Sequence, residues 1–247
     1  MSADVLLAKL KAAGLHVVEE PGWRTRGNRW NRNGKPEGIM QHHTAPPNPY
    51  PIKALYPTKR LQWRVKCNVA THPDGTLYLV AYKACNYSSG PGMAAVLKDN
   101  VRESIAPTHN ATRRGLKGGN RHFWNYENSH PGDGSRLPTA QFDTIVESTR
   151  ITQDHFELNA HQVISHAEWT RRKIDPNWNG SNRMAINQIR EAAMFTIHEI
   201  EELKRIVVSL DSVNSNGGFA GYAAMLVRKE RTYPLENMVT KTTAERR

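Results

Sequence analysis

The chain of 247 residues is long enough for one large domain, or for one domain with an appendage. Its hydrophobic content of 38% is ordinary for a globular protein, and no run of about 18 apolar residues exists that could span a membrane. The formal charge of +11 favours an anionic partner, either nucleic acid or an acidic polymer such as bacterial cell wall. Because the cations are scattered through loops and accompany no nucleic-acid-binding motif, we do not expect nucleic acid as the partner.

The two cysteines predict no disulfide, and the first residues of the chain indicate where the protein is made. Cys67 and Cys85 form no Cys-x-x-Cys motif, and we expect both to be buried thiols without a disulfide. The opening residues lack the basic start, long apolar stretch and small-residue cleavage site of a signal peptide. We therefore expect synthesis in the cytoplasm.

In chain order, the hydrophobic pattern predicts strands mixed with helices. The expected helices cover residues 3–13 and 93–101 and begin again at Pro138. The expected strands cover residues 15–19, 38–42, 64–71, 76–81, 122–127 and 163–165. A turn at residues 72–75 separates the third and fourth strands and predicts a hairpin there. Strands mixed with helices indicate an α/β fold in which helices cover a sheet.

The pattern changes after Gly180. Apolar residues alternate at spacings of three and four between residues 186 and 210, which is typical of a coiled-coil seam. The segment could form a homo-oligomer through residues 186–210, or a long amphipathic helix that folds back on the preceding domain. We expect a catalytic domain at 1–181, this helix at 182–211, and a linker and tail of undetermined role at 212–247.

Two histidines and an aspartate form a candidate metal site. His42 ends one predicted strand, His166 ends another, and Asp175 follows nine residues later beyond a turn. Imidazole and carboxylate are both good zinc ligands, and three protein ligands with one open position are typical of catalytic zinc. Neighbouring residues of a strand point to opposite faces, so only one of His42 and His43 can reach the metal. Purely structural histidines are the alternative.

Five blocks of sequence, in order, resemble the type 2 N-acetylmuramoyl-L-alanine amidases, a family that includes phage lysozyme-amidases and animal peptidoglycan recognition proteins. They are His-His-Thr-Ala (42–45), Pro-Asp-Gly-Thr (73–76), Ser-Ser-Gly-Pro-Gly (88–92), Tyr-Glu-Asn-Ser-His-Pro-Gly-Asp-Gly (126–134) and the stretch from His166 through Lys-x-Asp-Pro (166–176). The block at 126–134 is similar to versions in phages of actinobacteria. The resemblance covers residues 14–180 and implies a mixed central sheet flanked by helices.

The resemblance also implies the chemistry. His42, His166 and Asp175 would bind Zn²⁺, which activates a water molecule and polarises the carbonyl between muramic acid and L-alanine. Lys173 occupies the position of the family's lysine that stabilises the oxyanion. Glu127 is our candidate for proton transfer, with a structural carboxylate as the alternative. The family's strand often reads Gly-x-Glu, whereas this chain has Asn125 before Glu127.

Substrate contacts are expected from side chains near the groove. The stem peptide of peptidoglycan carries carboxylates that arginine binds well. The candidates are Arg121, Arg171 and Ser88.

The favoured interpretation is a zinc-dependent peptidoglycan hydrolase, specifically a phage endolysin that is made in the host cytoplasm and acts on the cell wall after release. One alternative is a non-catalytic peptidoglycan-binding or virion-associated module of the same fold. The other alternative is a basic nucleic-acid-binding protein. Under this hypothesis, the protein should bind DNA with an affinity that falls steeply with salt and does not change with chelators.

Overall fold

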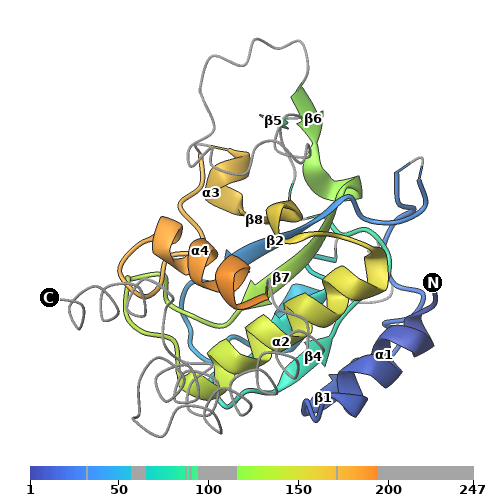
Figure 1. Cartoon of the computed structure of the whole chain (residues 1–247), viewed down its shortest axis with the longest axis horizontal. Helices are drawn as coiled ribbons and strands as arrows, with labels where there is room; N and C mark the ends of the chain where they lie inside the picture. Colours follow the sequence, from blue (N-terminus) through green and yellow to red (C-terminus); the bar gives the residue numbers. More distant parts are fainter. Residues whose placement is uncertain are drawn as a thin grey trace, which may run out of the picture.

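A computed structural model describes residues 1–31, 33–56, 65–86, 88, 91–93, 116–170 and 172–193 (Figure 1). Its centre is a mixed six-stranded sheet with strand order β1-β4-β3-β7-β2-β8. The strands are β1 (Val17–Glu19), β2 (Gly38–His43), β3 (Val69–Thr71), β4 (Leu77–Leu79), β7 (Phe123–Asn128) and β8 (Val163–Ser165). Only the β3–β4 hairpin is antiparallel among these pairs, and the α/β fold predicted from the sequence is confirmed.

Four helices accompany the sheet in the described part of the chain. They are α1 (Ala3–Ala12), α2 (Thr139–Phe156), α3 (His166–Trp169) and α4 (Asn182–Ala193). The short 3-10 turns are η1 (Ile52–Leu55), η5 (Gly119–Arg121) and η6 (Ala160–Gln162), and a separate small ribbon pairs β5 (Pro91–Met93) with β6 (Leu116–Gly118). Each of the four helices is too short or too polar to cross a lipid bilayer.

The main core lies between one face of the sheet and helices α1, α2 and α4. Alternate residues of the strands, such as Val69, Trp124 and Tyr126, pack there against apolar residues of the helices. Burial of this apolar surface is the main favourable term in forming the layer. Helix α4 contributes Ile186 and Ile189 to the same core, so the first three turns after residue 181 fold back on the sheet layer.

The opposite face of the sheet carries two smaller apolar clusters. One contains Ile52 and Leu55 of η1 together with Cys67 and Cys85, which are buried free thiols as expected. The other consists of Met40, Phe123, Ile164 and Trp169. The candidate site lies on this second face.

The expected homo-oligomer remains a prediction. Its proposed seam begins in α4, whose apolar residues are buried within the chain, and continues through residues 194–210, which lie outside the described part. The tail expected at 212–247 also lies outside the described part of the chain.

Candidate metal centre

Strand pairing places His42 on the second face of the sheet. In the parallel pair of β2 and β7, Met40 is opposite Asn125 and His42 is opposite Glu127. Paired residues point to the same side of a sheet and successive residues alternate, so these four side chains share one face. His43 therefore points to the other face, where its Nδ1 accepts a hydrogen bond from the backbone N–H of Asn177 at 3.0 Å.

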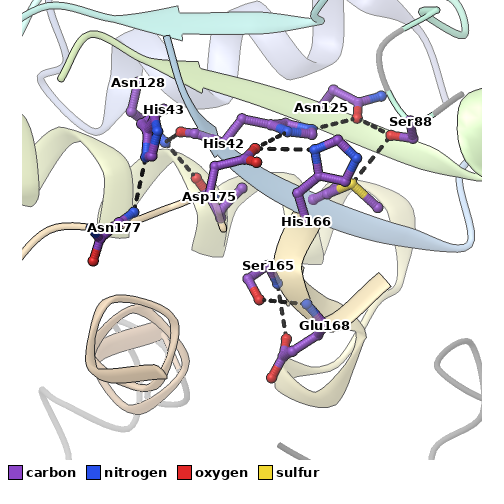
Figure 2. Close-up of polar contacts among 12 residues, drawn as sticks. His42, His43, Ser88, Asn125, Asn128, Ser165, His166, Glu168, Asp175 and Asn177 are labelled. Carbon is purple, nitrogen blue, oxygen red and sulfur yellow. Dashed lines mark hydrogen bonds and ion pairs between the residues drawn. The ribbon is translucent and has the colours of Figure 1, made fainter. Parts of the chain in front are cut away.

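The three predicted metal ligands meet at one point (Figure 2). The Oδ2 atom of Asp175 lies 2.8 Å from Nδ1 of His42 and 3.0 Å from Nδ1 of His166. The imidazole rings stand edge to face with centroids 4.5 Å apart, and each residue offers a ligand atom within 4.8 Å of the others. All three residues are buried. A convergent set of two nitrogens and one oxygen suits a metal ion.

The charges of the ligands also suit a cation. Burial, reinforced by the positive charge of Lys173 and opposed by Asp175, lowers the pKa of His166 to about 4. Burial would raise the pKa of Asp175, but its hydrogen bonds with His166 and His42 outweigh that effect and hold the pKa below its ordinary value. Near neutral pH the site thus offers a neutral imidazole and an ionised carboxylate, which are the forms that bind metals.

A capped turn fixes the direction of His166. Helix α3 begins at His166, and Ser165 caps it: the Ser165 hydroxyl accepts from the N–H of Glu168, whose carboxylate accepts in return from the N–H of Ser165. The far end of the segment is also tied, because the N–H of Ala167 donates to the carbonyl of Asp175 at 2.9 Å. Both ligands are therefore held by one compact segment.

Arg190 of α4 locks this turn to the sheet. Its guanidinium donates to both carboxylate oxygens of Glu168 at 2.8 and 2.9 Å, and to the carbonyl of Val163 at 2.7 Å. The side chains of Arg190 and Glu168 are only 18% and 8% exposed. A bidentate, nearly buried pair of this kind fixes geometry as well as contributing energy.

A second polar network holds the carboxyl ends of the central strands together. The Nδ2 of Asn128 donates to Oε1 of Gln41 and to the backbone carbonyl of His42, both at 2.9 Å. The Oδ1 of Asn128 accepts from the hydroxyl of Thr71 at 2.8 Å, and Gln41 donates to Thr149 of α2 at 3.0 Å. The backbone that carries His42 is thereby tied to β3, β7 and α2.

Glu127 and Lys173, the predicted catalytic residues, lie beside the ligands. Glu127 is buried on the same face as His42, directly across the strand pair. It lies close to Cys67, since burial first and then the charge of Glu127 raise the pKa of that thiol. Lys173 is exposed two residues before Asp175, and its charge acts on the nearby His166.

The predicted substrate-binding residues, unlike Glu127 and Lys173, do not lie beside the candidate ligands in the described part of the chain. Ser88 is fully buried, and its hydroxyl donates to the side chain of Asn125. In this structure Ser88 therefore supports the candidate site from the protein interior and is not exposed to a substrate. Arg121 is exposed just before the amino end of β7, and its Nε donates to the carbonyl of Arg29. The candidate ligands lie near the carboxyl end of β2, at the other end of this strand pair. Arg171 lies outside the described residues.

A family model described as N-acetylmuramoyl-L-alanine amidase (Amidase_2) matches residues 32–178, which is more than half of the chain and includes all three candidate ligands. The chain belongs to this family. The resemblance and the enzyme class predicted from the sequence are therefore confirmed, and the protein is an amidase that acts on peptidoglycan. Among curated proteins, none matches the chain significantly.

Solved structures with a similar arrangement are remote in sequence. The endolysin N-acetylmuramoyl-L-alanine amidase LysCS from Clostridium intestinale is 17% identical, with a TM-score of 0.42, over 66% of this chain and 88% of that one. A selenomethionine derivative of AmpD is 16% identical, with a TM-score of 0.43, over 67% and 88%. Drosophila peptidoglycan recognition protein SD is 9% identical, with a TM-score of 0.34, over 68% and 99%. At these TM-scores, the family membership rests on the sequence match.

Sequence reasoning missed two contributors to the site. Asn125 was noted only as a departure from the family's pattern, although a polar side chain at an inward position of an aromatic strand is itself a signal. Arg190 lies between the apolar positions of the heptad pattern, and its pairing with Glu168 has no signal in the spacing of the sequence.

Proposed function

We propose that the amidase is zinc-dependent, that it uses His42, His166 and Asp175 as ligands, and that it cleaves the bond between N-acetylmuramic acid and L-alanine. The observation that carries this proposal is the convergence of three buried ligand atoms within 4.8 Å on one face of the sheet. Zinc bound there would supply a Lewis acid and an activated water molecule.

The chain's own residues would complete the reaction. Glu127, across the strand pair from His42, would accept a proton from the attacking water and deliver one to the leaving amine. Lys173, exposed beside Asp175, would place its ammonium against the negative charge that develops on the substrate oxygen. The buried position of Glu127 and the exposed position of Lys173 agree with these different tasks.

We further propose that the target is the intact bacterial cell wall and that the protein is a phage endolysin, made in the host cytoplasm and active after release. The net charge of +11 supports attraction to an anionic wall, because such charge steers association with polyanions.

The test is digestion of purified peptidoglycan with detection of new N-terminal L-alanine. New ends should appear, disappear with a chelator and return when zinc is added. His42→Ala should abolish both zinc binding and activity. His122→Gln is the matched control, because this histidine pairs with Glu37 at the opposite end of the strands. Bound zinc without new ends, on walls of several types, would favour the non-catalytic binding module.

The endolysin role needs a separate assay. Expression inside a bacterial host should leave cells intact until the membrane is permeabilised, and lysis should then be rapid. Absence of lysis, despite release of L-alanine ends from purified wall, would refute the endolysin role but not the amidase activity.

A further inference from the structure

The carboxamide of Asn125 touches the side of His42 that faces away from the other ligands. Its Oδ1 lies 3.0 Å from Nε2 of His42, while Nδ1 of the same ring faces Asp175 (Figure 2). Both side chains are completely buried. The two ring nitrogens of His42 therefore have different and fixed neighbours.

The orientation of the Asn125 carboxamide follows from its other contacts. Its Nδ2 donates to the backbone carbonyl of Phe123 at 2.8 Å, and a carbonyl can only accept. The amide nitrogen must therefore point to Phe123, which leaves Oδ1 towards His42. The hydroxyl of Ser88 donates to the same Oδ1, so a second donor supports this orientation.

The backbone of Asn125 is also fixed. Its N–H donates to Oδ1 of Asn68 at 2.9 Å, and its carbonyl accepts from the N–H of Asn68 at 2.9 Å. The Nδ2 of Asn68 donates in turn to the carbonyls of Ala81 and Lys83. Neither the backbone nor the side chain of Asn125 can turn without the loss of several buried hydrogen bonds, which is costly.

An amide oxygen has no hydrogen to give, so Nε2 of His42 must carry the hydrogen of this contact. A bound metal would displace any hydrogen from Nδ1, which faces Asp175, and the imidazole would then keep its one hydrogen on Nε2. We propose that Asn125 is a positioning residue for the metal site, which holds His42 in the tautomer whose Nδ1 binds the metal, with Ser88 as its support. This inference rests on the zinc site proposed above.

The first test is spectroscopic. Long-range ¹H–¹⁵N spectra of the zinc-bound protein near pH 7.5 report which nitrogen of each histidine carries the hydrogen and which binds the metal, and comparison with His42→Gln assigns the signals of His42. We expect the hydrogen on Nε2 of His42 and zinc on Nδ1. A hydrogen on Nδ1 would overturn the inference, whatever the catalytic activity.

The second test measures zinc affinity by competition with a chromophoric chelator. Asn125→Leu keeps a similar volume without an acceptor, and should weaken zinc binding by about 10- to 100-fold, as the loss of outer partners of ligands typically does. Asn125→Asp keeps an oxygen that accepts from Nε2, and should bind zinc far more tightly than Asn125→Leu. Equal losses in both variants would show that shape matters and the acceptor does not, and would overturn the inference.

Thr144→Val is the matched control. It removes a buried hydrogen bond from Thr144 of α2 to the carbonyl of Gly75 in the β3–β4 turn, without contact with a ligand or with the strand that carries His42. We expect lower stability but unchanged zinc affinity of the folded protein. If the wild-type protein binds no zinc, the zinc site itself fails and the inference fails with it. If wild type and Asn125→Leu bind zinc equally well, the inference alone fails.

Discussion

Replacing Arg190 with alanine should destabilise the amidase strongly, although this residue lies beyond the stretch that matches the family. The change leaves the carboxylate of Glu168, whose side chain is 8% exposed, and the carbonyl of Val163 without their strongest partner. Removal of one partner of a buried ion pair costs about 3–5 kcal/mol. Because the Arg190 side chain keeps 18% of its exposure, we expect the lower end of that range.

Thermal unfolding of the metal-free protein measures this effect. In a protein of this size, about 3 kcal/mol corresponds to a fall of about 6–12 °C in Tm. The matched control is Arg183→Ala, in an exposed position of the same helix, for which we expect a change within about 0.5 kcal/mol.

A double-mutant cycle refines the test. Arg190→Met combined with Glu168→Gln should cost less than the sum of the single changes, because the single changes each leave a buried group unpaired. A loss below about 1 kcal/mol for Arg190→Ala, or strict additivity in the cycle, would refute the reasoning.

Glu127→Gln should lower kcat by about 10²- to 10⁴-fold while zinc content is kept, since it removes a proton acceptor beside the metal site; equal activity would refute that role. Lys173→Met should lower kcat by about 10²- to 10³-fold with zinc retained, and loss of zinc would instead indicate a structural role. Gly132→Ala should destabilise the protein, because an added Cβ would lie 2.3 Å from Nε2 of His43 at a φ of +76°; an unchanged Tm would contradict the packing. Burial lowers the pKa of His155 to about 4, so the folded state resists its protonation. Stability should therefore fall as pH drops from 6.5 towards 4, by up to about 3 kcal/mol, and urea unfolding of His155→Gln should lack this part of the pH dependence.

Much of the sheet could be predicted because its strands are short apolar runs bounded by turn residues. The hairpin around His72–Gly75 and the strand before His166 follow from local pattern alone. The parallel pairing of β2 with β7 does not, because it joins residues more than 80 positions apart and local sequence carries no register. The motifs predicted His42, His166 and Asp175 as ligands, and the structure adds that these three side chains converge.

Where the prediction of the site was incomplete, the cause lies in side-chain packing. Ser88 begins one of the blocks that resemble the family, yet its hydroxyl is turned inward to Asn125. The apolar spacing that begins at Ile186 fits a coiled coil and a helix on its own domain equally well, because both bury one stripe of the helix. In α4 this stripe faces the sheet layer.

The packing of α4 has a practical consequence for recombining this enzyme with other modules. A fragment cut at residue 178, where the family match ends, would retain the candidate ligands His166 and Asp175 but lose the arginine that anchors their segment. The cut would also uncover the apolar surface of α2 and the strands that Ile186 and Ile189 cover, and such exposed patches promote aggregation. Chimeric amidases built from this chain should therefore place the junction after Ala193.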